Sequence, residues 1–139
     1  MSLKDIVLPK ETIEFSGGSF AVRGLSFNDV LTLVNEHRPA IEPLFMQAVA
    51  GGLPMGDQVE LGLMLVEKAP AVVAHAVALA ADEPDGAAAF LRLPVDVQLD
   101  AIERLMRVTF ALVGGPKKFG QTVLRIVEST RAGAVSLKR

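Results

Sequence analysis

The chain has 139 residues, half of them apolar and none of them cysteine, with 14 basic against 16 acidic side chains. This length is typical of one domain, and the apolar content excludes a disordered, charge-dominated segment. The lack of cysteine excludes a disulfide-stapled secreted scaffold, and the near-neutral charge without a basic block argues against nucleic-acid binding.

The first twelve residues alternate charges with short apolar pieces and contain no apolar core of a signal peptide. The least polar stretch, 69–81, is thirteen residues long, whereas a membrane-spanning helix needs about 20. The sequence therefore predicts a cytoplasmic protein without a membrane segment.

Two alternating runs of polar and apolar residues predict an N-terminal β-hairpin. They cover 11–15 and 20–23, and Gly17-Gly18 lies between them, where a tight turn favours glycine. An isolated two-stranded hairpin is marginal in water. We therefore expect its apolar side chains to pack on helices or on another chain; they are Ile13, Phe15, Phe20 and Val22.

After Gly24 the apolar spacing changes from a period of 2 to one of 3.6, which predicts helices. The first begins at Ser26, whose spacing to Asp29 resembles a capping box. It runs to about His37, where Pro39 ends or kinks it. Further helical segments are predicted at 39–50, 57–68, 71–81, 87–91, 96–113 and 117–131, with a solvated acidic turn at 82–85.

The last two of these helices are joined by a short Gly114-Gly115-Pro116 connection, so we expect them to pack as an antiparallel pair. The predicted fold is mainly α, with the N-terminal β-hairpin followed by five or six helices. We divide it into a hairpin arm at 1–24, a helical domain at 25–132 and a flexible tail at 133–139.

The segment 59–81 is more apolar than a pair of surface helices needs to be, and His75 is the only polar side chain of 71–81. One such helix fits the core of a chain this long, but two strain its interior. We predict that this segment and the hairpin face contact other protein chains, including further copies of this one. The residues assigned to that surface are Ile13, Phe15, Phe20, Val22, Val72, Val73 and Val77. The alternative is that both helices form a large core.

No catalytic, cofactor-binding or metal site is predicted. Two histidines without cysteine do not supply a tetrahedral metal set by spacing, and His37 and His75 are interpreted as structural. The glycine pairs at 17–18 and 114–115 match no phosphate-binding motif. Two other classes stay open: a small enzyme whose carboxylates converge in space, and a small helical regulatory or adaptor protein that binds an unknown partner.

Several short motifs at both ends of the chain occur in an order and spacing similar to those of a known family. They are Leu8-Pro9, Gly17-Gly18-Ser19-Phe20 and Val22-Arg23-Gly24-Leu25-Ser26, followed by Leu93-Pro94, Gln98-Leu99, Ala101-Ile102, Thr109-Phe110 and Gly114-Gly115-Pro116-Lys117-Lys118-Phe119. Over 8–45 and 93–125 the chain resembles the tail assembly chaperones of tailed bacteriophages, which are encoded just before the tape-measure gene.

The resemblance implies a non-enzymatic phage or prophage factor in the cytoplasm of the bacterial host. Such proteins keep the tape-measure protein soluble and promote assembly of tail-tube subunits around it. The implied partners are the tape-measure protein, the major tail (tube) protein and further copies of the chain, without cofactor, nucleic acid or membrane. In many relatives a ribosomal frameshift makes a longer form that recruits tube protein. Apolar helices such as those predicted at 57–81 are suited to covering apolar helical segments of a client.

Overall fold

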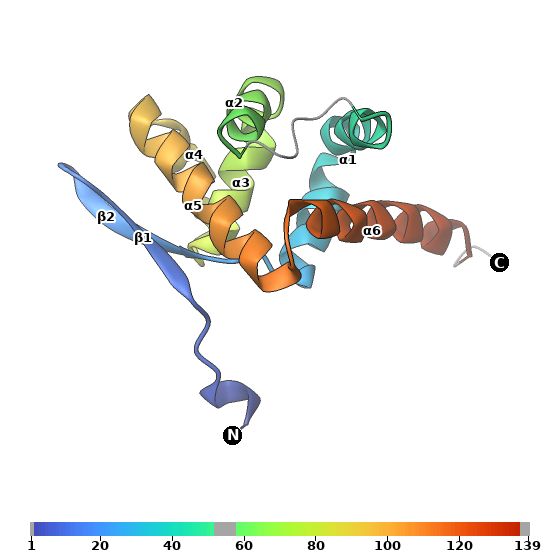
Figure 1. Cartoon of the computed structure of the whole chain (residues 1–139), viewed down its shortest axis with the longest axis horizontal. Coiled ribbons are helices and arrows are strands. Elements are labelled where there is room, and N and C mark those ends of the chain that lie inside the picture. Colours follow the sequence, from blue (N-terminus) through green and yellow to red (C-terminus); the bar gives the residue numbers. More distant parts are fainter. Residues whose placement is uncertain (1, 52–57, 137–139) are drawn as a thin grey trace.

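The computed structural model describes residues 2–51 and 58–136 (Figure 1). The elements are β1 (Lys10–Phe15), β2 (Gly18–Arg23), α1 (Phe27–Val49), α2 (Gln58–Lys68), α3 (Pro70–Ala80), α4 (Ala87–Leu91), α5 (Val95–Val113) and α6 (Pro116–Ser136). Short 3-10 turns, η1 (Leu3–Asp5) and η2 (Pro84–Gly86), precede β1 and α4. The predicted mainly helical fold is confirmed, because an antiparallel hairpin is followed by six α-helices in the described residues.

The hairpin packs on the helical body. β1 and β2 pair antiparallel with Ile13 opposite Phe20 and Glu11 opposite Val22. Both strands contact α5, and Ile13 and Val22 are fully buried there. At the outer edge the Glu11 carboxylate accepts a hydrogen bond from Arg107 on α5 at 2.9 Å. The inner face of the hairpin is therefore closed by helices of its own chain.

Helix α1 is broken at His37, whose backbone angles (φ −120°, ψ 25°) are not helical. The break, predicted near His37, thus falls on His37 itself, two residues before Pro39. A proline ring crowds the carbonyl four residues earlier and offers no N–H, so the strain reaches back along the helix. The break changes the direction of α1, and α1 also packs against α3.

Helix α3 lies at the centre of the fold and contacts α1, α2, α4, α5 and β2. Its side chains Val73, Ala74, Val77 and Ala80 are buried. Since neighbours surround it on most sides, it needs no polar face. In the described part of the chain no single helix is long and apolar enough to cross a membrane; α2 and α3 reach that length and composition only together, with a bend of 112° between them.

The two C-terminal helices do not form the antiparallel pair predicted from their short connection. In Figure 1, α6 leaves the end of α5 and extends away from it instead of folding back alongside. The two helices touch near their junction, where the rings of Phe110 and Phe119 are 5.5 Å apart. Farther along, Arg38 on α1 donates to the Thr130 hydroxyl at 2.6 Å. Packing against α1 therefore sets the direction of α6, which also continues past the predicted end at 131.

Candidate functional site

Helices α1, α2, α3, α5 and α6 surround a partly open apolar cavity of about 220 Å³, here called the apolar groove. Its walls include Val34 and Leu44 of α1, Leu65 of α2, Val73 of α3, Met106 of α5 and Phe119 of α6. Protein interiors rarely contain voids larger than a water molecule. An engineered apolar cavity of about 150 Å³ already binds benzene. The groove is therefore large enough to take up apolar side chains of another molecule.

The groove offers almost no polar chemistry. Thr109 is the polar side chain in its lining, and its hydroxyl already accepts the backbone N–H of Leu25 at 3.1 Å. The surrounding side chains that are half-buried, and so reach both groove and surface, are Leu25, Leu44, Leu65, Val72 and Phe119. An apolar partner surface can be desolvated here, but no group is present to orient a polar ligand.

The residues predicted to contact other chains lie in different environments. Ile13 and Val22 are fully buried under the hairpin, and Val77 is buried at the centre of α3. Another chain could reach these three only if the domain opened. Phe15, Phe20 and Val72 are half-buried, and Val72 and Val73 both line the apolar groove. Contact of the predicted residues with a partner remains a prediction, and the residues that a partner can reach without opening the domain are Phe15, Phe20 and Val72.

Sequence reasoning missed a second apolar surface, in the segment before β1. Four of its apolar side chains are 47–89% exposed: Leu3, Ile6, Val7 and Leu8. Figure 1 shows this N-terminal segment, called here the N-terminal arm (residues 2–9), extending away from the helical body. Its charges hid the signal, because each apolar piece is short. A count of the apolar residues that precede the hairpin could have revealed this apolar surface.

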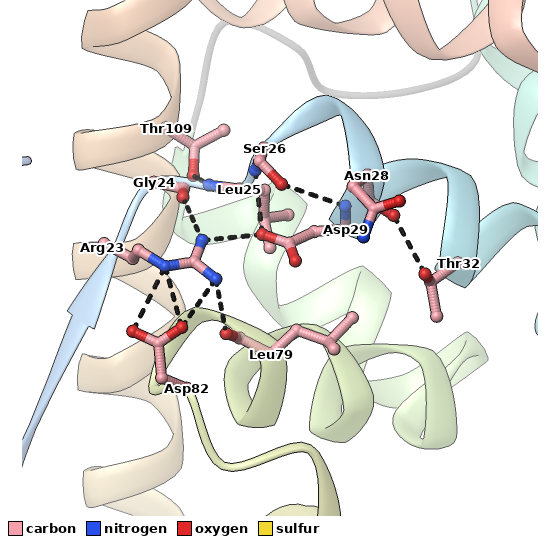
Figure 2. A network of polar contacts seen from close by, with 10 residues as sticks. All are labelled: Arg23, Gly24, Leu25, Ser26, Asn28, Asp29, Thr32, Leu79, Asp82 and Thr109. Atoms are coloured by element: carbon pink, nitrogen blue, oxygen red, sulfur yellow. Dashed lines mark hydrogen bonds and ion pairs between the residues drawn. The ribbon is translucent and has the colours of Figure 1, made fainter. Parts of the chain in front are cut away.

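A network of polar contacts around Arg23 joins four elements (Figure 2). From the end of β2, the Arg23 guanidinium donates to Asp29 on α1 at 2.7 Å and to the Leu79 carbonyl on α3 at 3.1 Å. It also pairs with Asp82 after α3, at 2.9 Å. Because Leu25 bonds to Thr109 on α5, the same corner reaches that helix. We call this cluster the Arg23 junction.

Asp29 is the buried anion of the Arg23 junction. Its Oδ2 accepts the Ser26 backbone N–H at 2.9 Å while the Ser26 hydroxyl accepts the Asp29 N–H at 3.1 Å, so the predicted capping box is present. Burial would raise the pKa of Asp29, but the hydrogen bonds from Arg23 and Ser26 outweigh it and hold the pKa below its usual value. Hydrogen bonding to Asp29 likewise raises the pKa of Arg23. Both shifts favour the charged form of the pair.

The motif Val22-Arg23-Gly24-Leu25-Ser26, which carried part of the family resemblance, thus serves the fold. A Cβ on Gly24 would lie 2.7 Å from Leu112 Cδ1, the end of an exposed side chain, and 3.4 Å from the α5 backbone at Thr109, so this turn lies close against α5. Asp82 lies in the predicted solvated turn, where its side chain is 60% exposed, and it is also the outer partner of Arg23; its backbone is left-handed (φ 59°). The junction therefore fixes the hairpin and three helices relative to one another.

The two histidines, 38 positions apart, meet where α1 breaks. His37 Nε2 and His75 Nδ1 are 2.9 Å apart, and the Glu36 carboxylate lies 3.5 Å from the same His75 nitrogen. Among the described residues, Glu36, His37 and His75 form a group of three potential metal ligands whose ligand atoms all lie within 4.8 Å of one another. The expectation that no metal set would form rested on spacing along the chain and did not anticipate this convergence.

Comparison with known proteins gives one family. The family model described as Pre-tape measure protein matches residues 1–139, which is the full length of the given sequence. Neither a curated protein nor a solved structure matches the chain.

Proposed function

Because the chain belongs to the pre-tape measure protein family, a family of phage tail assembly proteins not known as enzymes, we propose that it is a tail assembly chaperone. In this role it binds apolar segments of the tape-measure protein and keeps that protein soluble until the major tail protein assembles around it. It acts in the cytoplasm of the bacterial host, where tails are built.

The apolar groove is the observation that carries this proposal. An amphipathic helix buries side chains at i, i+3, i+4 and i+7 in a groove lined by apolar residues. The groove has room for such side chains between α1, α2, α3 and α6, and its lining has no polar group free to select one client sequence. A client with many similar apolar helices is suited to a binding surface of this kind.

The composition of the groove fits transient binding. Tight protein interfaces concentrate binding energy in Trp, Tyr and Arg, and this chain contains no Trp or Tyr. Leu, Val, Met and Phe supply area without strongly directional contacts. A chaperone has to release its client to the growing tube, so moderate affinity per site is useful. The exposed N-terminal arm provides a second apolar surface, through which copies of the chain or the tube protein could associate.

The experiment is coexpression of the chain with a segment of the tape-measure protein, reading the soluble fraction of that segment. Leu65→Asp places a charge on the groove wall, and Leu63→Asp places one on the exposed side of the same helix α2. We expect Leu65→Asp to lower the soluble fraction several-fold and Leu63→Asp to leave it near wild type. Circular dichroism checks that both variants fold. Equal client solubility with the folded Leu65→Asp variant would contradict the proposal.

A further inference from the structure

Three potential metal ligands converge on one point between α1 and α3. His75 Nδ1 lies 2.9 Å from His37 Nε2 and 3.5 Å from Glu36 Oε2. All three ligand atoms lie within 4.8 Å of one another. The side chain of His75 is 15% exposed and that of Glu36 is 60% exposed, so the point is sheltered on one side and open to water on the other.

These separations are close to those of ligands around one zinc ion. Zinc binds imidazole nitrogen at about 2.0–2.1 Å, so two nitrogens on a tetrahedral ion lie about 3.3–3.4 Å apart. The His37 and His75 ring nitrogens are hydrogen-bonded to each other at 2.9 Å. A bound ion would replace this hydrogen bond and widen the separation of the two nitrogens by a few tenths of an ångström. Imidazole and carboxylate ligands together suit zinc and its neighbours in the transition series.

The backbone supplies a reason for the convergence. His37 is the residue at which α1 leaves helical geometry. In an unbroken helix, consecutive residues such as Glu36 and His37 point in directions about 100° apart. The break alters that direction, and both side chains reach His75 on the facing helix.

We propose that Glu36, His37 and His75 bind one divalent transition-metal ion of the zinc class, leaving a coordination position for water or a partner's side chain. Such an ion requires neutral imidazoles.

Metal binding would act on the walls of the apolar groove. Val34 and Ile41 flank His37 on α1, and Val73 and Ala76 flank His75 on α3; all four line the groove. An ion bound by both histidines cross-links these two walls beside the break in α1. The site is argued from its own geometry, so it stands independently of the chaperone role.

The test is a calorimetric titration of the tag-free, chelator-treated full chain with Zn²⁺ at neutral pH. We expect one ion per chain and no binding of Mg²⁺, which prefers an all-oxygen site. His37→Gln or His75→Gln should each weaken Zn²⁺ affinity at least tenfold. Glu36→Gln should weaken it less, since Glu36 is exposed. The matched control Glu128→Gln, an exposed carboxylate on α6, should bind as the wild type does.

A second measurement uses only the wild type and so does not depend on the variants folding. Nitrogen-15 spectra of the imidazole rings report which ring nitrogens bind the ion. Both His37 and His75 should show a large shift on addition of Zn²⁺. Absence of Zn²⁺ binding, or binding that leaves both ring spectra unchanged, would overturn the proposal. Undiminished binding by the folded His37→Gln/His75→Gln double variant would overturn it as well.

Discussion

The Arg23 junction and the apolar groove differ in how completely their atoms are partnered. At the junction each guanidinium nitrogen of Arg23 donates a hydrogen bond, and its acceptors include the buried Asp29. In the groove, apolar walls from five helices leave about 220 Å³ unfilled. The first region specifies one arrangement of the elements. The side chains around the apolar groove lack van der Waals contacts on the side of the unfilled space, and a bound apolar segment can supply those contacts. Under the proposed function, stability and client binding are thus assigned to separate places in the fold.

The largest expected effect is at the junction. Arg23→Ala leaves the buried carboxylate of Asp29 without its cation, and breaking a buried ion pair in this way costs about 3–5 kcal/mol. Urea unfolding of the full chain measures the change. The control is Arg107→Ala, whose partner Glu11 lies at the exposed edge of the hairpin; an exposed ion pair contributes less than about 1 kcal/mol. Similar losses for the two variants would show that the junction is not a special anchor.

Enlarging two alanines of α3 sharpens the comparison. Ala76 lines the apolar groove, whereas Ala78 is buried away from it, next to the turn at Gly86. Ala76→Leu fills empty space and should raise the free energy of unfolding by about 0.5–2 kcal/mol. Ala78→Leu overfills packed space and should lower it by about 1–3 kcal/mol.

The same pair separates stability from function. Ala76→Leu should reduce the soluble fraction of a coexpressed tape-measure segment even though the protein is more stable, because the groove is partly filled. Urea unfolding and the coexpression assay together give the answer. A stabilised Ala76→Leu protein that still keeps the client fully soluble would assign client binding to another surface.

The smallest expected effect is the dependence of stability on acid. The pKa of Asp29 is below its usual value in the folded protein, so its stabilising contribution is complete above the unfolded pKa of about 3.9. That contribution is lost as the pH falls through the lower, folded pKa. Asp29→Asn should therefore flatten the acid limb of a plot of urea midpoint against pH. Asp5→Asn removes a fully exposed carboxyl whose pKa is also lowered, and the acid limb should keep nearly its wild-type slope.

Local patterns were sufficient for most of the secondary structure. The Gly17-Gly18 turn, the Ser26–Asp29 capping box and the 3.6-residue spacing of α5 are each determined by residues within one or two turns of each other. The break in α1 was also expected from Pro39. Its position at His37 reflects strain that the proline transmits to the preceding turn.

The candidate sites could not be predicted in the same way, because their residues are distant in the chain. Arg23 and Asp82 are 59 positions apart, and His37 and His75 are 38 apart. The spacing of apolar residues along a helix or strand carries no information about such distant pairs. Arg23 entered the sequence analysis only as part of a motif, and the two histidines were interpreted separately, so neither cluster was visible.

By itself the sequence determined the hairpin, the helical segments and, through its motifs, the family. These depend on backbone geometry and on apolar spacing, which act over a few residues. Only the tertiary structure decided which apolar faces are closed by the chain's own helices. It buried Ile13, Val22 and Val77, directed α6 across α1, and left Leu65, Val72 and Phe119 around an open groove. Hydrophobic burial is non-directional, so an apolar stripe does not specify its partner; that choice is made when all the helices pack together.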